Sequence, residues 1–343
     1  MNNITVHGAA SSKAHVLMGR LLKDSDYKKL METKNIYEFI EYLTKNTNYK
    51  NVFLNSDEIK HREDIEIGMK KYLLKNYEKF YHYYHDNYRN FFKVLFMRYE
   101  IENIKLFIRA TNRNEDVRHL RDHLITSELF TTIDYDQMIK SRNIHELIDA
   151  LKGTIYHEIL MVYLNEESVK MQFYMEMSLD RIYFKKIKEI VKTFKGKDKE
   201  LMNELLGKNS DLLNIQWIYR AKKFYYLSSE EILNYTLESG LKYDYKRLKE
   251  FCYLESVEEL NELVLNTEYK VLFLEEEIFM ERNMERFLFF LLDDLLKKGN
   301  NTIIVSLNYM HKLEYEARDL FSILECIKYG FSNSDEYLVR ILK

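Results

Sequence analysis

The sequence contains no proline, and glycine accounts for only nine of its 343 residues. At an average proline content of about 5 per cent, a chain of this length would carry roughly 17 prolines. Because proline and glycine mark turns, sheet edges and loops, a chain poor in both favours long helices joined by short connections. An AT-rich genome would also deplete proline, so the absence supports a helical fold and does not prove it.

Cysteine and long apolar runs are scarce as well. Cys252 and Cys326 form no CxxC or paired-loop pattern, which favours buried thiols in a reducing compartment. Residues 1–22 lack the apolar core of a secretory signal. The longest apolar run, 287–292, is followed at once by two aspartates, whereas a bilayer span needs about 20 apolar residues. We therefore expect no membrane-spanning segment.

An excess of one charge is also missing. Fifty-two lysines and arginines face 55 aspartates and glutamates, which gives a formal net charge of −3 with both signs mixed along the chain. A dedicated nucleic-acid binder would normally show a basic excess, so this class is disfavoured. Apolar residues at 46 per cent are sufficient for a buried core.

What the sequence does contain is a repeated helical phrase. NIKLFIRA (103–110) returns as NIQWIYRA (214–221), and each phrase carries one apolar stripe with helical spacing. A third stripe runs through 313–327, where Asp319 takes the place of the two asparagines and the phrase becomes DLFSILEC. The third copy therefore keeps the pattern while losing most of the letters.

A second phrase precedes each copy of the first. It spans 27–49, 135–156 and 245–269, and each version contains a short amphipathic helix and ends in Thr-x-Tyr. The resulting period of about 110 residues exceeds the roughly 20 to 50 residues of solenoid repeats. The sequence thus predicts an all-α protein made by internal triplication. Its three helical modules are residues 1–115, 116–228 and 229–343.

Longer helices should fill the intervals between these phrases. The first stretch should begin near Ile65 and contain a turn near 85–87. The second and third should cover 166–194 and 275–298. Glycine is the strongest loop signal in a chain without proline. Loops are therefore expected at Gly196, Gly207 and Gly299.

Patterns that would indicate chemistry are incomplete. His119 and His123 have i,i+4 spacing but lack the glutamate of a zinc protease and a third ligand, and His157-Glu158 lacks its second histidine. Residues 207–210 resemble the end of a phosphate loop without its upstream glycine. Acidic runs such as 275–277 read as solvated helix faces. We expect no catalytic residue, metal or cofactor, although catalytic groups can converge in space without a sequence pattern.

The order of these phrases resembles one family over the whole chain. KAHVLMGRLLKDSDYKKL (13–30), RYEIENIKLFIRA (98–110) and SDLLNIQWIYRAKKFYYLSSEEI (210–232) are similar to segments of the C subunit of V-type (A/V-type) ATPases. The ending NYMHKLEYEARDLFSILECIKYGFSNSDEYLVRIL (308–342) is similar too. In that family, the C subunit is the counterpart of the d subunit of eukaryotic V-ATPases.

The resemblance implies a fold and a mechanical function. It implies a funnel of three similar helical domains with pseudo-threefold symmetry, peripheral at the cytoplasmic face of the membrane and monomeric in isolation. Such a protein is non-catalytic and couples the rotating shaft, made of the D and F subunits, to the membrane rotor ring during ATP-linked proton or sodium transport. The alternatives are a helical-repeat scaffold for other protein partners and, less favoured, a helical hydrolase.

Five residues of the repeated phrases are candidates for contacts with the shaft or between modules. They are Asn103, Arg109, Asn214, Arg220 and Arg318. A competing interpretation is that the arginines pair with nearby carboxylates inside each module.

Overall fold

The computed structural model describes residues 3–53, 62–238, 240–331 and 334–342. Regular structure within these ranges is helical, and they contain no strand. The all-α prediction is therefore confirmed for the described chain.

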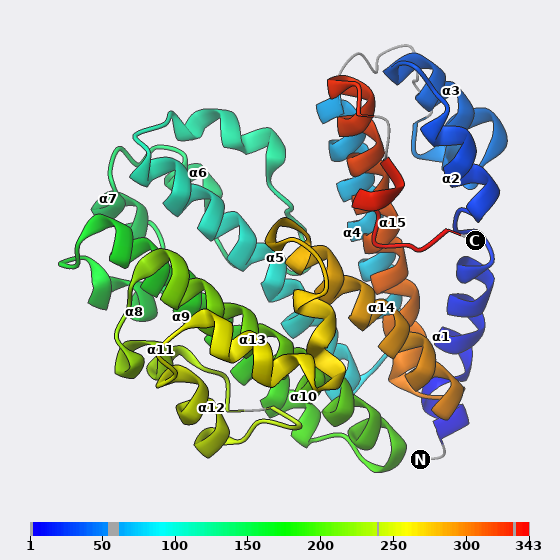
Figure 1. Ribbon diagram of the computed structural model, residues 1–343. Helices are drawn as coiled ribbons and strands as arrows, with labels where there is room; N and C mark the ends of the chain where they lie inside the picture. Colours follow the sequence, from blue (N-terminus) through cyan, green and yellow to red (C-terminus); the bar gives the residue numbers. More distant parts are fainter. Residues whose placement is uncertain (1–2, 54–61, 239, 332–333, 343) are drawn as a thin grey trace.

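Six helices of the described chain contain 19 to 27 residues and form three helix–turn–helix pairs (Figure 1). The pairs are α4 (Arg62–Tyr83) with α5 (Asp86–Asn112), α9 (Ser168–Lys192) with α10 (Gly196–Arg220), and α14 (Met280–Lys298) with α15 (Ile303–Tyr329). The two repeated phrases of the sequence lie in α5 and α10, and the third stripe lies in α15. The last predicted interval begins late, because a 3-10 turn (Glu277–Phe279) precedes α14.

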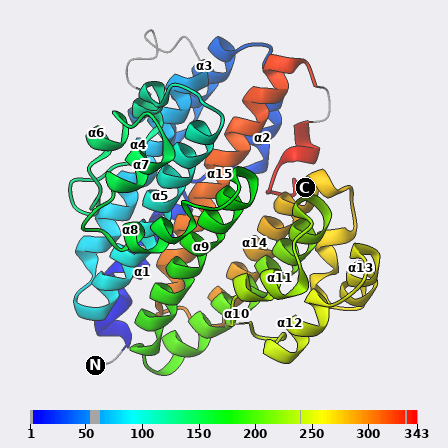
Figure 2. The same cartoon turned by 90° about the vertical axis from the view of Figure 1, so that its left-hand side faces the viewer.

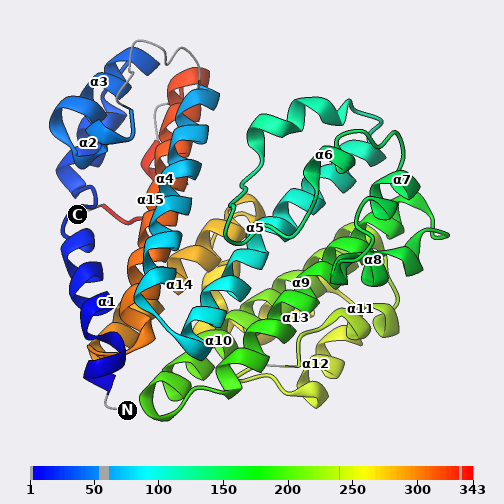
Figure 3. The ribbon, with the colours of Figure 1, turned by 180° about the vertical axis from the view of Figure 1, so that it is seen from behind.

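These long helices pack in a cyclic order. Helix α4 packs on α5, α5 on α9, α9 on α10, α10 on α14, α14 on α15, and α15 returns to α4. Figures 1 and 3 show α4 and α15 side by side, and Figure 2 shows α5, α9 and α10 in succession across the molecule. Helix α1 (Asn3–Met18) lies along α15. The last long helix therefore meets the first.

Short helices fill the three intervals that carry the Thr-x-Tyr phrase. The first block holds α2 (Asp24–Met31), α3 (Ile36–Asn46) and η1 (Asn48–Asn51), the second holds α6 (Tyr135–Met138), α7 (Ile144–Asp149) and α8 (Ile155–Leu160), and the third holds α12 (Tyr245–Cys252), α13 (Val257–Leu265) and η6 (Glu268–Phe273). The remaining elements are η3 (Val117–His123), η4 (Met161–Tyr163), the π-turn η5 (Ala221–Tyr225), α11 (Ser229–Tyr235) and η8 (Ser334–Tyr337).

The same helix cap begins the central helix of each block. The side chains of Asn35, Asn143 and Ser256 each accept a hydrogen bond from the backbone N–H of a glutamate three residues later. That glutamate in turn accepts from the backbone N–H of the residue before the cap. Such reciprocal caps satisfy N–H groups that a helix start leaves unpaired. The short helices therefore start where the repeated phrase places them.

The predicted loop at Gly207 is wrong. Gly207 lies inside α10, and a Cβ there would stand 2.8 Å from the Cβ of Leu241. The backbone N–H of Leu241 donates to the carbonyl oxygen of Gly207 at 3.3 Å. This glycine allows a second chain segment to approach the helix closely, which is a packing use that sequence reasoning cannot distinguish from a turn.

Buried apolar residues form three clusters in the described chain. One cluster unites residues 10–99 with parts of α9, α10, α14 and α15, so that the two ends of the chain share a core. A second gathers residues 101–179 and a third gathers residues 173–280. Figures 1 and 3 show the C-terminal end beside the link between α1 and α2. Arg340 fixes it there, because its Nε donates to Asp24 and its Nη1 donates to the carbonyl oxygen of Leu22, each at 2.9 Å.

None of the helices in the described part of the chain is long and apolar enough to cross a membrane.

Candidate functional site

A tyrosine at the end of each Thr-x-Tyr phrase is buried and held in the same way three times. Tyr49, Tyr156 and Tyr269 are 3, 1 and 0 per cent exposed. The threonine two residues earlier accepts from the backbone N–H of each tyrosine at 3.1 to 3.2 Å. The same threonine donates its hydroxyl to a carbonyl oxygen of the preceding helix or turn at 2.6 to 2.8 Å. The phrase thus directs each phenol into the core.

Each of these phenols donates its hydrogen bond to a buried carboxylate on a long helix. Tyr156 donates to Glu100 on α5 at 2.8 Å, and Tyr269 donates to Asp211 on α10 at 2.7 Å. Tyr49 donates to Glu316 on α15. The three carboxylates lie three residues before Asn103, Asn214 and Asp319, at equivalent positions of the repeated helical phrase. We call each tyrosine–carboxylate pair a clamp.

Backbone N–H groups complete the clamps, in different numbers. Asp211 accepts from the backbone of residues 241, 242 and 243 at 2.8 to 3.2 Å. Glu100 accepts from the backbone N–H and the hydroxyl of Thr132. Glu316 accepts from the backbone N–H of Leu22 at 2.6 Å. The clamp of Tyr49 therefore has the fewest other donors.

The clamps join each block to the long helix of another copy. The second block meets α5, the third block meets α10, and the first block meets α15. The second and third blocks each come directly after the long helix to which their clamp joins them. The first block is the exception, because α15 lies at the other end of the chain. The pairing is cyclic, like the packing of the long helices.

Asn103 and Asn214 each bind, through two side-chain hydrogen bonds, the backbone of a residue that follows their helix in the sequence. The Nδ2 of Asn103 donates to the carbonyl oxygen of Ile125 at 2.9 Å, and its Oδ1 accepts from the same residue's N–H. Asn214 makes the same pair of bonds with Leu237, at 2.9 and 2.7 Å. Both side chains are buried. They fix the segments around Ile125 and Leu237, which follow α5 and α10 in the sequence, against these helices.

Asp319 occupies the equivalent place in α15. Its carboxylate accepts from the backbone N–H groups of Val339 at 2.6 Å and Arg340 at 3.2 Å. An aspartate fits here because both partners are donors, whereas the asparagines face one donor and one acceptor. The exchange of Asn for Asp therefore follows from the local backbone.

Burial dominates the electrostatics of the third copy. It raises the pKa of Glu316 to about 7, although the hydrogen bonds from Tyr49 and Leu22 act in the opposite direction. Burial likewise raises the pKa of Asp319 to about 7 against the bonds from Val339 and Arg340. Two carboxyl groups that hold both ends of the chain thus titrate near neutral pH.

The three candidate arginines have different surroundings. Arg109 on α5 donates its Nε to Glu176 on α9 at 2.8 Å. Arg318 on α15 donates to Glu285 on α14. Arg220 at the end of α10 is exposed and makes no ion pair or hydrogen bond with its side chain among the described residues. Arg109 and Arg318 therefore bridge neighbouring long helices, whereas Arg220 bridges none of the described helices.

A cluster around Asp198 joins the turns of the long helix pairs, and sequence reasoning missed it. Asp198, in the first turn of α10, accepts from Tyr88 of α5 at 2.6 Å and from the backbone N–H of Ile303 of α15 at 2.8 Å. It also lies 2.8 Å from Nε2 of the buried His7 of α1. Since the partners come from three other helices, no local spacing could have revealed this cluster. It marks the end of the molecule where the three turns meet, which we call the turn end.

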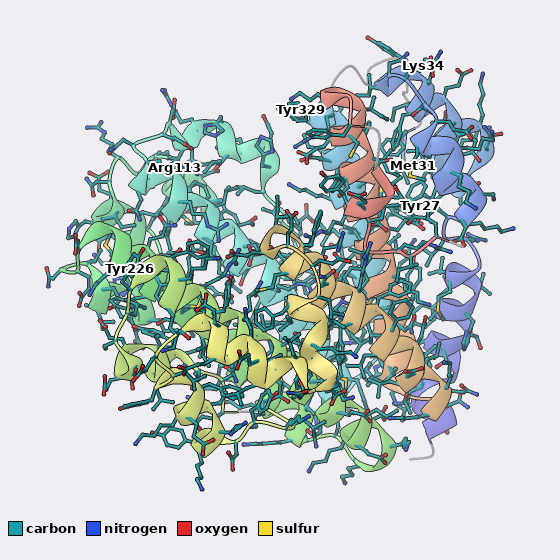
Figure 4. The ribbon with its side chains drawn as sticks, viewed as in Figure 1. Tyr27, Met31, Lys34, Arg113, Tyr226 and Tyr329 are labelled. Atoms are coloured by element: carbon teal, nitrogen blue, oxygen red, sulfur yellow. The ribbon has the colours of Figure 1, made fainter. Side chains whose placement is uncertain are left out.

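The opposite ends of α5, α10 and α15 carry residues with positive φ. Asn114, Tyr226 and Gly330 have φ of 55°, 49° and 71°. After α5 and α15, the backbone N–H that follows the positive-φ residue donates to the carbonyl oxygen five residues earlier. After α10 the corresponding bond reaches back six residues, from the N–H of Leu227 to the carbonyl oxygen of Ala221. The extra residue creates the π-turn η5 and leaves Tyr226 85 per cent exposed (Figure 4). π-turns of this kind often mark functional segments.

The histidines and cysteines that the sequence patterns single out have the following places. His119 and His123 lie in the 3-10 helix η3, and Cys252 and Cys326 are free, buried thiols. No group of three or more His, Cys, Asp or Glu side chains suited to a metal ion occurs within the described residues.

A family model described as ATP synthase (C/AC39) subunit matches residues 10–335. The match includes all three clamps and the residues of the cluster around Asp198 except His7. It confirms the family resemblance that the sequence phrases indicate.

Curated relatives carry one name. The C subunit of the A-type ATP synthase of Methanosarcina mazei is 27% identical over 163 residues, which cover 48% of this chain and 44% of that protein. The same protein of Methanocaldococcus jannaschii is 24% identical over 233 residues, covering 67% and 58%. That of Methanosphaera stadtmanae is 24% identical over 263 residues, covering 76% and 65%. The chain thus aligns with less than two thirds of the length of each of these relatives.

Proposed function

Because this chain belongs to the ATP synthase (C/AC39) subunit family, we propose that it is a non-catalytic rotor component of an A/V-type ATP synthase or ATPase. In this proposal it lies in the central stalk and joins the shaft, made of the D and F subunits, to the membrane rotor ring. It couples ATP synthesis or hydrolysis to proton or sodium transport. It is peripheral, faces the cytoplasm, needs no cofactor and is a monomer in isolation.

The observation that carries this proposal is the cyclic repetition of the clamp. A body that turns about an axis and must meet a narrow shaft and a wide ring is well built from equivalent units around that axis. Three equivalent clamps, three helix pairs packed in cyclic order and the return of α15 to α4 support such an arrangement. We propose a funnel with pseudo-threefold symmetry, built from modules 1–115, 116–228 and 229–343.

The direction of the helices suggests which end receives the shaft. The helix turns lie together around Asp198 at the turn end. Towards the other end, α4 and α15 diverge from α5 and α9 in Figures 1 and 3. We infer that the shaft enters at the divergent end.

Arg220 is our candidate for a shaft contact. It lies at the divergent end of α10, is exposed, and lacks the carboxylate partner that Arg109 and Arg318 have among the described residues. The side chains of Asn103 and Asn214 are hydrogen-bonded to the backbone of Ile125 and Leu237, so we assign them an internal role. Arginine is enriched among the few residues that dominate binding energy at protein interfaces.

The experiment is co-elution with the recombinant D and F subunits by size-exclusion chromatography. We expect a stoichiometric ternary complex that is lost when the helical tip of the shaft is removed. Failure to co-elute at micromolar concentration and low salt, with all proteins folded, would favour a scaffold for other partners.

A charge-reversal pair tests the residue assignment. Arg220→Glu should weaken the complex by tenfold or more, an effect of about 1.4 kcal/mol. Arg142→Glu is the matched control, because Arg142 is also exposed and its side chain is unpaired in the described structure. Equal affinities of the two variants would remove Arg220 from the proposed contact.

A further inference from the structure

A dense group of lysines occupies the turn between α9 and α10. Residues 185–199 contain seven lysines, and five of them are exposed: Lys185, Lys188, Lys192, Lys195 and Lys199. None of these five makes an ion pair or hydrogen bond with its side chain among the described residues. We call them the lysine strip.

The acidic residues of this segment do not neutralise the strip. Glu189 pairs with Lys186 at 3.2 Å, and Glu200 pairs with Lys197 at 2.7 Å. Asp198 is buried and already bound to three partners. The five lysines therefore keep their positive charges, although the whole chain carries a formal charge of only −3.

Helical spacing aligns the strip. Steps of three and four residues place Lys185, Lys188 and Lys192 on one face of α9. Lys195 directly precedes the first residue of α10, and Lys199 follows four residues later in that helix. Figures 1 and 3 show this turn at the lower end of the molecule, near the N-terminal end of α1. The strip is therefore an exposed surface of α9 and α10 near the turn end.

The surroundings add features of a surface that lies against a membrane. Exposed Lys297 and Lys298 end the neighbouring helix α14, each bound to one carboxylate. Tyr83, at the end of α4, is 39 per cent exposed. Tyrosine and lysine side chains are enriched where proteins meet lipid headgroups, because an apolar stem and a polar tip fit that boundary.

The residue type distinguishes a lipid surface from a protein partner. Protein interfaces are enriched in arginine and aromatic residues and depleted in lysine. Within 185–199 the cations are all lysine, and the nearest arginine before them in α9, Arg181, lies one turn further from the hairpin. Clusters of four to eight basic residues on a helix are typical of contacts with anionic phospholipids.

We propose that the lysine strip of the α9–α10 turn contacts anionic phospholipid headgroups at the membrane surface. The proposal rests on the position at the membrane that the proposed function implies, and it assigns the turn end to the membrane side. The contact is electrostatic and reversible, because the strip has no apolar side chain to insert. It therefore weakens steeply with salt as the Debye length falls.

Vesicle co-sedimentation of the full chain tests the proposal. The protein should bind vesicles of phosphatidylcholine mixed with phosphatidylglycerol at low salt and should not bind vesicles of phosphatidylcholine alone. Each lysine near an anionic surface contributes a factor of roughly five. The variant K185Q/K188Q/K192Q/K195Q/K199Q should therefore lose about three orders of magnitude in affinity.

A matched variant removes five exposed lysines elsewhere. It carries K34Q, K50Q, K140Q, K242Q and K246Q, at positions outside the lysine strip. This variant should keep most of the binding. Equal loss in both variants, or no binding of the unmodified protein to anionic vesicles, would overturn the proposal. Circular dichroism melts check that both variants fold.

Two further arms separate this proposal from neighbouring ones. Binding of the strip variant and the unmodified protein to the isolated rotor ring is compared in a neutral phosphatidylcholine membrane. A loss confined to the strip variant there would show that the lysines meet protein and would overturn the lipid contact. Co-elution with the shaft should be the same for both proteins, so failure of the proposed function is recognised independently.

Discussion

Replacement of the clamp tyrosines by phenylalanine tests the most repeated contact of the fold. Tyr49→Phe, Tyr156→Phe and Tyr269→Phe each remove one hydroxyl from a buried site and keep the ring. Each change takes one donor from a buried carboxylate. The three sites differ in how many donors remain, so the variants form an internally controlled series.

The remaining donors set the expected order of destabilisation. After the change, Asp211 keeps three backbone N–H groups and stays nearly as well bound as before. Glu100 keeps the N–H and hydroxyl of Thr132, and Glu316 keeps the single N–H of Leu22. A hydrogen bond to a charged group contributes about 1.5 to 3 kcal/mol. At a pH well above 7, where Glu316 is charged, we expect a loss of about 3 kcal/mol for Tyr49→Phe and about 1.5 kcal/mol for Tyr269→Phe, with Tyr156→Phe between them.

The Tyr49 variant should also depend on pH. The pKa of Glu316 is raised to about 7, so the carboxyl is neutral below that pH and charged above it. A neutral hydrogen bond contributes only about 1 kcal/mol. The cost of Tyr49→Phe should therefore increase as pH rises through about 7.

Equilibrium urea unfolding measures these free energies. Far-UV circular dichroism follows all helices, and the fluorescence of Trp217, the single tryptophan, follows α10. Coincident transitions by both probes justify one free energy of unfolding. At a pH well above 7, a loss for Tyr269→Phe as large as that for Tyr49→Phe would refute the argument from remaining donors.

Four further predictions concern changes of single residues. Asn214→Ala removes both bonds to Leu237 and leaves a buried N–H and carbonyl unpaired, so urea unfolding should show a loss of about 2 to 4 kcal/mol. Tyr226→Gly should raise the free energy of unfolding by about 1 kcal/mol. The change removes an exposed side chain from a left-handed backbone with φ of 49°, where a side chain is sterically unfavourable. Gly330→Ala should lower it by about 1 kcal/mol, since φ is 71° there. Folding raises the pKa of Glu316 to about 7, so the contribution of this carboxyl to the free energy of unfolding is full below its unfolded pKa of about 4.3 and is lost as pH rises through about 7. Glu316→Gln should flatten this fall in stability, measured by urea unfolding across that pH range.

Local spacing in the sequence is enough to predict the elements and part of the clamps. The helical stripes, the caps of the short helices and the Thr-x-Tyr endings each depend on residues within a few positions of one another. The Thr-x-Tyr tyrosines stand out for this reason, and the carboxylates are available to the same reasoning. Glu100, Asp211 and Glu316 recur three residues before the aligned Asn or Asp, at a constant offset.

Contacts between distant segments are outside the reach of that reasoning. A loop prediction at Gly207 is wrong because its use, the close approach of Leu241, involves a segment distant in the sequence. The cluster around Asp198 needs four helices to be in place before it exists. Whether an arginine is paired, as Arg109 is, or exposed without a described partner, as Arg220 is, also depends on helices that only the fold brings near.

The order of blocks and helices along the chain itself favours a closed arrangement. Two clamps join a long helix to the block that follows it in the sequence, and this order leaves the first block and α15 without such a neighbour. In an open row, Glu316 on α15 and Tyr49 in the first block would both be buried without their bond or would have to be exposed. An unpaired buried polar group costs about 1 to 3 kcal/mol, and an unpaired charge costs more. Joining the two ends satisfies both groups at once, and Arg340 adds its bonds to Asp24 and Leu22 at the same junction. This junction supports the proposed closed arrangement of three units around an axis.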